Sequence, residues 1–340
     1  MTVNKVNMQP SPVLFKIACR GILSPQTRTT PLKCITNGTE SVQEDVSSKK
    51  IEDTQKIVPL KPEEDLFSNV KDSYFDSHCH LDFLLNKADF QGSFSDYKMQ
   101  HPDEFPPNFD GCIAVFCNPY SFRKFFSWEK HLEDSKVWAS FGCHPKNASF
   151  YDDSIEQDLR RALGHPKVRA LGEIGLDYSD RSHCPRGKQQ QVFRRQLKIA
   201  KEKHLPLVLH CREAYEDCYD ILKEELPDNY PIHMHCFSDS WCIAEKFLKE
   251  FPNLHIGLTN LVTFPSAVEV QEVAMKVPLE RLLLETDAPY FVPTSLSETA
   301  KFAHPGMAIY VAEKIASLRG ISIKEVAFCT RQNVRWIYNV

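Results

Sequence analysis

The sequence has no hydrophobic run of the roughly 20 residues that a membrane-spanning helix needs. The stretch PVLFKIACRGIL, over residues 12–23, is too short and carries two basic side chains. A CxxC pair is also absent among the twelve cysteines, most of which lie in apolar runs such as GCIAVFC. This pattern is typical of buried, reduced thiols and argues against a disulfide framework. We therefore expect an intracellular protein, nuclear or cytoplasmic, without membrane association.

An excess of positive charge is missing as well, since 41 Lys and Arg residues stand against 45 Asp and Glu residues. A broad basic surface for duplex nucleic acid is therefore not expected, and any contact with nucleic acid must come from a local patch. The 340 residues, 42% of them hydrophobic, suffice for one large domain or two small ones. Nothing in the sequence points to an obligate protein partner.

Residues 1–72 are polar, contain scattered prolines and show no sustained hydrophobic period. Such a segment can bury little apolar surface, so we predict a largely disordered, variable tail. Its first acidic residue is Glu40, and five basic residues precede it, which makes a mitochondrial transit peptide the weaker alternative. The folded domain is expected over residues 73–340.

From residue 74 onward, short β-rich apolar runs alternate with longer segments of helical periodicity. This alternation indicates parallel βαβ units, and eight of them in about 265 residues match the size of a (β/α)8 TIM barrel. An open, doubly wound sheet is the alternative. Long connections are expected over residues 84–107 and 287–304. The predicted strands cover residues 74–78, 111–117, 137–142, 168–175, 205–210, 230–235, 253–258 and 281–286. Clear helical patterns cover residues 189–204, 213–226, 241–251 and 308–320.

Two histidines stand one residue apart in the segment YFDSHCHLDF. Alternate side chains of a strand share a face, so His78 and His80 point the same way, with Asp76 and Asp82 beside them if the strand continues. Taken alone, the pair favours ordinary hydrogen-bonded histidines. However, histidines and carboxylates recur where the other predicted strands end, which is where a barrel places its active site. The residues at these strand ends are His78, His80, His144, Glu173, His210, His235, Glu285 and Asp287.

This recurrence predicts a metal centre, because neutral imidazole is the commonest metal ligand in proteins. Six protein ligands exceed what one tetrahedral zinc needs, and they fit two ions about 3.5–4 Å apart that share a carboxylate. The predicted ligands are His78, His80 and Asp287 for one ion, His210 and His235 for the other, and Glu173 as the bridge. Imidazoles favour Zn, Mn, Fe or Co, whereas carboxylates and substrate phosphates would suit Mg. We expect two divalent ions, with Mg, Mn and Zn as the candidates.

The segments FDSHCHLD, FGCHP, LGEIGLDY, LHCREA, HCFS and LLETDAPY resemble the motifs of TatD-type metal-dependent deoxyribonucleases, a family of amidohydrolase-like barrels. The resemblance runs from residue 74 to residue 340 and is strongest to the animal form with a C-terminal TatD domain. It implies a (β/α)8 fold, a divalent-metal site at the six positions above, and hydrolysis of DNA as a 3′–5′ exonuclease, with RNA as a further substrate. Two departures bear on substrate preference. Lys146 follows the GxHP motif where the family often has histidine, and Asp239 stands where it usually has glycine.

The expected mechanism is attack of a metal-activated water on phosphorus, with Asp287 or Glu173 holding the water and accepting its proton. The candidates for contacts with the substrate phosphate are His144, Lys146, Asp177 and Arg212. Asp82 and Glu285 are the candidates to orient the metal ligands without binding metal themselves. For three of these residues a structural role is the alternative: a salt bridge for Arg212, a hydrogen bond near the GCHP turn for His144 and a turn cap for Asp177. The basic segment over residues 181–204 offers a path for a phosphate backbone, or else only a solvated helix face.

Two other classes of protein remain open. One is a small-molecule amidohydrolase, lactonase or phosphoesterase on the same barrel, and the other is a non-catalytic metal-binding scaffold. Many barrels of the first class bridge their metals with a modified lysine at the end of strand four, where this chain has Glu173. A scaffold would have no physical need for six polar ligands at one end of the barrel. Both arguments favour the nuclease.

Overall fold

The computed structural model describes residues 73–123 and 128–340, so the tail predicted over residues 1–72 lies outside the described part. The strands are β1 (Tyr74–Cys79), β2 (Phe109–Phe116), β3 (Val137–Phe141), β4 (Val168–Asp177), β5 (Leu207–Arg212), β6 (Ile232–Met234), β7 (Leu254–Leu258) and β8 (Leu282–Leu284). The α-helices are α1 (Leu81–Lys87), α2 (Phe94–Gln100), α3 (Asp153–Ala162), α4 (Arg186–Lys203), α5 (Tyr215–Glu225), α6 (Trp241–Glu250), α7 (Val268–Lys276), α8 (Ala308–Arg319) and α9 (Ile323–Tyr338). Short 3-10 helices are η2 (Pro102–Glu104), η3 (Trp128–Glu133), η4 (Pro145–Phe150), η5 (Asn260–Thr263), η6 (Leu279–Arg281), η7 (Thr294–Leu296) and η8 (Pro305–Met307).

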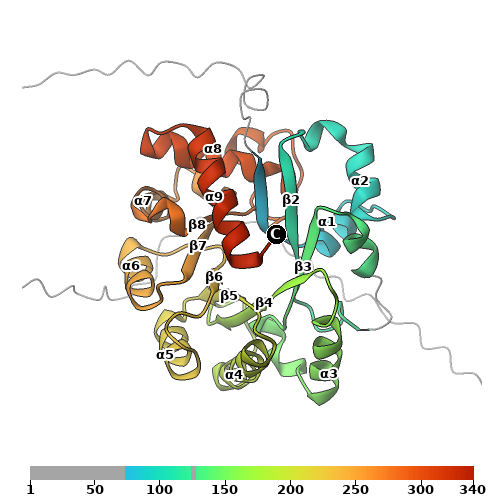
Figure 1. The fold of residues 1–340 in the computed structure, drawn as a ribbon, viewed down its shortest axis with the longest axis vertical. Helices are drawn as coiled ribbons and strands as arrows, with labels where there is room; N and C mark the ends of the chain where they lie inside the picture. Colours follow the sequence, from blue (N-terminus) through green and yellow to red (C-terminus); the bar gives the residue numbers. More distant parts are fainter. Residues whose placement is uncertain (1–72, 124–127) are drawn as a thin grey trace, which may run out of the picture. The chain divides into compact units, whose positions relative to one another are not determined.

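The eight strands form one parallel sheet in the order of the sequence, β1 to β8, with helices around the outside (Figure 1). The chain beyond β8 returns to β1, where Cys79 and Ala288 form a parallel bridge. The hydroxyl of Ser77 also donates to the carbonyl of Leu284 over 2.8 Å. The sheet is therefore a nearly closed barrel, which confirms the predicted (β/α)8 fold over the open, doubly wound sheet.

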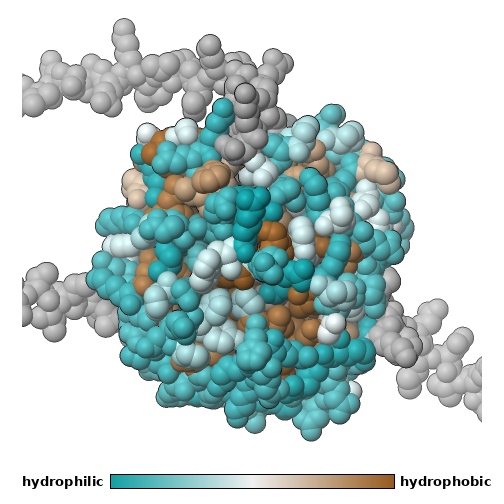
Figure 2. Space-filling view, in the orientation of Figure 1, coloured by the Kyte–Doolittle hydropathy of each residue, from teal (hydrophilic) through white to brown (hydrophobic). Residues whose placement is uncertain are grey.

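The barrel interior is filled by a cluster of buried side chains from alternate strand positions. This cluster contains Phe75, Ile113, Val115, Cys117, Ala170, Val208 and Leu283, together with Val334, Ile337 and Tyr338 of α9. α9 lies across the amino ends of the strands, which Figure 1 shows in front of the barrel. Its Asn333 amide donates to the carbonyl of Leu282 over 2.8 Å, at the start of β8. This end of the barrel is thus covered, and its surface in Figure 2 is mainly hydrophilic.

The connections differ most from the sequence prediction. α4, α5, α6 and α8 match the four predicted helices, but the long first connection contains α2. A capping box begins α2, because the Ser93 hydroxyl accepts the Asp96 amide and the Asp96 carboxylate accepts the Ser93 amide. No helix of the described residues is long and apolar enough to cross a membrane. The ten described cysteines are free thiols, seven of them buried, in line with the predicted absence of a disulfide framework.

Candidate metal centre

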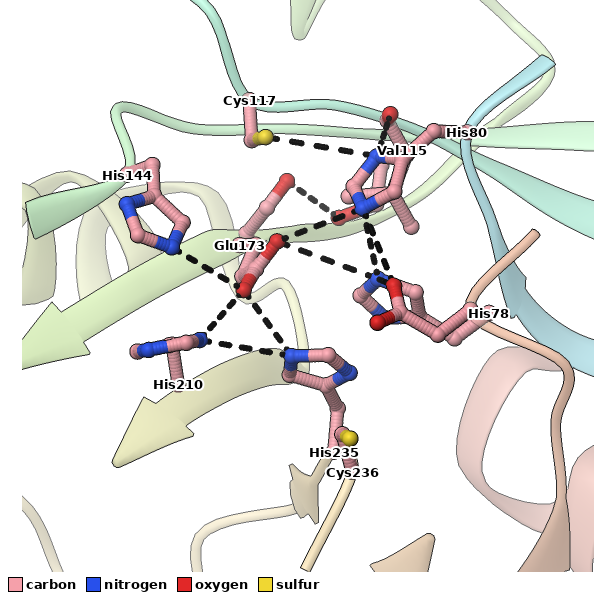
Figure 3. A network of polar contacts seen from close by, with 12 residues as sticks. His78, His80, Val115, Cys117, His144, Glu173, His210, His235 and Cys236 are labelled. Carbon is pink, nitrogen blue, oxygen red and sulfur yellow. Dashed lines mark hydrogen bonds and ion pairs between the residues drawn. The ribbon is translucent and has the colours of Figure 1, made fainter. Parts of the chain in front are cut away.

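The six predicted ligands meet at the carboxyl end of the barrel, and Figure 3 labels five of them, all except Asp287. His78 lies in β1 and His80 directly after it, Glu173 in β4, His210 in β5, His235 directly after β6, and Asp287 three residues after β8. Four of them are buried, whereas His210 and Asp287 are half-buried. Parallel strands end at one rim of a barrel, so residues far apart in the sequence share one small volume.

Glu173 lies at the centre of this group (Figure 3). Its Oε1 lies 2.6 Å from Nδ1 of His210 and 2.9 Å from Nε2 of His235. Its Oε2 lies 3.8 Å from Nε2 of His78 and 3.7 Å from Nε2 of His80. Each carboxylate oxygen therefore faces one pair of histidines.

The first histidine pair also faces Asp287. Oδ1 of Asp287 lies 3.7 Å from Nε2 of His78 and 3.2 Å from Nε2 of His80, and the two Nε2 atoms are 3.4 Å apart. Nδ1 of His80 lies 2.9 Å from the carbonyl of Val115, which can only accept a hydrogen bond. That contact places the proton of neutral His80 on Nδ1 and turns the Nε2 lone pair toward the centre.

Neighbouring charges set the ionisation of the centre. Burial by itself raises the pKa of Glu173, but His235 and the other histidines around it hold that pKa well below its usual range. Burial, followed by the repulsion of His235, holds the pKa of His78 well below its usual range. The carboxylate is thus ionised and His78 is neutral, which are the forms that bind metal ions. Burial by itself lowers the pKa of His80, His210 and His235, but neighbouring acidic groups raise it above its usual value, so these rings must give up a proton when a metal ion binds.

A second polar group lies at the rim. β4 runs two residues farther than predicted and brings Asp177 beside Nε2 of His210, at 3.2 Å, and Nζ of Lys146, at 3.1 Å. Nδ1 of His144 accepts the amide of Lys146, and its Nε2 lies 3.5 Å from Oε1 of Glu173. Ligand atoms of His144, Asp177 and His210 lie within 4.8 Å of one another. Three of the predicted phosphate contacts therefore border the six central residues.

Within the described part of the chain, three other residues that the sequence singled out form no hydrogen bond or ion pair with the six central side chains: Asp82, Arg212 and Asp239. β1 ends at Cys79 and Asp82 belongs to α1, so Asp82 does not share the strand face of the two histidines, and its carboxylate accepts the amide of Phe83. Arg212 is exposed at the end of β5 and forms no ion pair with a described carboxylate. Asp239 accepts the amide of Ser240, the residue before α6, rather than an amide inside that helix.

Asp76 and Cys117 have roles that the sequence reasoning did not assign. The Asp76 carboxylate accepts the amide and the hydroxyl of Thr286, at 3.0 and 2.6 Å, and so fastens β1 to the segment that carries Asp287. Sγ of Cys117 lies 4.0 Å from Nδ1 of His80. Cys117 ends the predicted strand over residues 111–117, so the rule that found the histidines also points to it.

Histidines and carboxylates gathered at this end of a (β/α)8 barrel are typical of metal-dependent hydrolases. Within that class the chain belongs to the TatD related DNase family, whose model matches residues 75–339.

Relatives of known sequence agree with this assignment. The chain is 41% identical over 280 residues to the human 3′–5′ RNA nuclease TATDN2, covering 82% of this chain but only 37% of that protein. It is 33% identical over 270 residues to the metal-dependent hydrolase YabD of Bacillus subtilis, covering 78% of this chain and 99% of YabD. The crystal structure of the TatD homologue YJJV from Escherichia coli matches with a TM-score of 0.67 and 29% identity, covering 78% of this chain and 98% of that one. The chain thus spans nearly the full length of YabD and YJJV, but little more than a third of TATDN2.

Proposed function

We propose that this protein is a divalent-metal-dependent nuclease that hydrolyses phosphodiester bonds of DNA or RNA from the 3′ end, inside the cell. The observation that carries the proposal is the position of Glu173, with one oxygen toward each histidine pair. A relative at 41% identity is named a 3′–5′ RNA nuclease, and the Erwinia amylovora TatD, 34% identical over 206 residues, is named a 3′-5′ ssDNA/RNA exonuclease. We place the activity in a single domain over residues 73–340.

We propose that the six central residues hold two divalent ions. The fit rests on atoms of the chain itself: Nε2 of His80, which presents a lone pair once the ring is neutral, lies only 3.4 Å from Nε2 of His78 and 3.2 Å from the Asp287 carboxylate. Lone pairs and a carboxylate that face one another at this distance suit a cation between them. Two bound divalent ions would lower the pKa of a water and polarise the phosphate. Imidazole-rich ligation favours Mn or Zn, and Mg would depend on the two carboxylates.

Asp287 and two basic residues near the centre would act on the water and the phosphate. Asp287 is half-buried and would hold the attacking water and accept its proton. The side chain of Lys146 is one third exposed, and its Nζ, beside Asp177, offers positive charge to a phosphate oxygen. The exposed guanidinium of Arg212 would clamp the same phosphate.

The surface near the rim suits a single strand better than a duplex. Tyr120 and Phe150, on the connections after β2 and β3, are 42% and 55% exposed, and their ring centroids lie 6.1 Å apart. Exposed aromatic rings of this kind stack on unpaired bases. In the basic segment, Arg194 and Arg195 are bound to carboxylates of neighbouring helices. The free positive charge is therefore local, which agrees with the net charge of the chain.

A cleavage assay of the full chain tests the proposal. End-labelled single- and double-stranded DNA and RNA would be incubated with Mg, Mn, Zn or EDTA, beside the double variant His78→Ala/His80→Ala. His204→Asn is the matched control, because His204 is exposed at the far end of α4 and Asn tolerates its left-handed backbone. We expect metal-dependent shortening from the 3′ end that the double variant lacks and the control retains. Absence of cleavage with metal bound would contradict the proposal and favour a small phosphoester or lactone as substrate.

A further inference from the structure

Three buried polar side chains, Tyr338, His233 and Glu285, follow one another through the barrel interior from α9 to the metal centre; we call them the polar row. The Tyr338 hydroxyl lies 2.5 Å from Nδ1 of His233, and Nε2 of His233 lies 2.8 Å from Oε2 of Glu285, although this second pair is poorly aligned for a hydrogen bond. The three side chains are 1%, 0% and 0% exposed, respectively. None of the three is among the six central residues.

The polar row needs a physical reason, because barrel interiors are normally filled with branched apolar side chains. Burying a tyrosine hydroxyl, an imidazole and a carboxyl group is costly unless each finds a partner. The neighbouring strand β7 makes room for them. A Cβ atom on Gly257 would come within 2.3 Å of Nε2 of His233 and 2.5 Å of Oε2 of Glu285. A side chain at residue 257 would therefore push this pair apart.

The polar row ends beside the segment that carries His235, one of the proposed ligands. Oε1 of Glu285 accepts the amide of Cys236 in a short hydrogen bond and lies 3.9 Å from Nδ1 of His235. That Nδ1 atom has no hydrogen-bond partner among the described residues. A histidine that binds metal through Nε2 usually donates its Nδ1 proton to a carboxylate or carbonyl, which fixes the ring. Glu285 stands in the place of that acceptor.

We propose that Tyr338 and His233 are positioning residues for the metal centre: they hold Glu285, and through it the residues 235–236, in the orientation that binds metal. The inference rests on the proposed metal site. It makes the C-terminal turn of α9 part of that site, although α9 lies at the opposite end of the barrel. Two side chains that the reaction never touches would then influence metal affinity.

Metal affinity of the full-length Tyr338→Phe variant tests this inference. Removing one hydroxyl should weaken Mn²⁺ binding about three- to tenfold, less than the roughly 10–100-fold loss for a direct partner of a ligand. Free Mn²⁺ would be followed by electron paramagnetic resonance, because thiols compete less for Mn²⁺ than for Zn²⁺. Tyr74→Phe is the matched control, since Tyr74 is equally buried and its hydroxyl donates to the carbonyl of Gly306 over 2.8 Å.

A double-mutant cycle separates positioning from general packing. In the Glu285→Gln background, Tyr338→Phe should cause little further loss of Mn²⁺ affinity, whereas Tyr74→Phe should have the same small effect in both backgrounds. His233→Leu removes the middle member of the polar row. It should reproduce the loss of Mn²⁺ affinity if Tyr338→Phe proves too unstable to measure.

Three outcomes would overturn the inference: unchanged Mn²⁺ affinity in Tyr338→Phe, an equal loss in Tyr74→Phe, or a loss that is independent of Glu285. Absence of Mn²⁺ binding by the wild-type protein would overturn it as well. Normal Mn²⁺ binding without nucleic-acid cleavage would instead contradict the proposed nuclease activity alone.

Discussion

Replacing Glu173 with alanine removes the carboxylate that faces both histidine pairs. We expect hydrolysis to fall at least about a thousandfold, because bound metal supplies several kcal/mol of transition-state stabilisation. The barrel should stay folded, since its interior cluster does not include Glu173. Cleavage rate, circular dichroism and metal content would be measured on the same preparation, with Glu173→Gln beside it. Full activity of Glu173→Ala in metal-replete buffer would rule out the bridging role.

Most residues of the centre were predictable because they lie at or just beyond the end of an apolar run, whereas Glu173 lies inside β4, four residues before its end. A strand end can be read from hydropathy, and the parallel barrel does the rest by bringing those ends to one rim. Tyr338 and His233 could not be found in this way. They lie 105 residues apart, and only the path of α9 across the amino ends of the strands brings the phenol to the imidazole.

At the level of elements, the connections after β2 and β3 should carry substrate affinity. The double variant Tyr120→Ala/Phe150→Ala removes the exposed aromatic pair, and one stacked base is worth about 1–3 kcal/mol. We therefore expect KM for a single-stranded oligonucleotide to rise about 5- to 150-fold with little change in kcat. Hydrolysis of a small phosphodiester such as bis(p-nitrophenyl) phosphate should be unaffected.

Phe328→Ala serves as the control for the aromatic pair, because Phe328 is 53% exposed on α9, away from the rim. Equal effects of the two variants on KM, or equal losses on the oligonucleotide and the small ester, would show that the aromatic pair does not bind bases.

The helices were less predictable than the strands. α4 and α5 show long, regular apolar periods, whereas α1 and α2 have seven residues each, too few to show a visible period. α2 begins at a capping box, and α1 begins without a side-chain cap. α9 was missed for another reason. Its buried face contains Thr330, Arg331 and Asn333 among apolar residues. Arg331 and Asn333 meet Asp110 and carbonyl groups near the strand starts, whereas the Thr330 hydroxyl donates to a carbonyl of α9 itself.

At the scale of the whole molecule, buried histidines far from the centre should make the fold sensitive to acid. Burial lowers the pKa of His131 to about 4, that of His255 to about 4 and that of His304 to about 3, from an ordinary value of 6.5. Between the folded and unfolded pKa values the unfolded chain binds more protons, so the free energy of unfolding must fall as pH falls. The window runs from about pH 6.5 down to about pH 4.

His131→Phe isolates one of these protons, because the ring of His131 already stacks near Phe116, with centroids 6.4 Å apart, and its Nδ1 has no hydrogen-bond partner among the described residues. Urea unfolding at pH 7.5, 6, 5 and 4.5, in EDTA, would give the free energy of unfolding of both proteins. The wild-type protein should lose stability faster below pH 6.5, by up to about 1.4 kcal/mol per pH unit relative to the variant. Parallel pH profiles would mean that His131 is protonated in the folded state or reached by water, and the burial argument would then fail for this histidine.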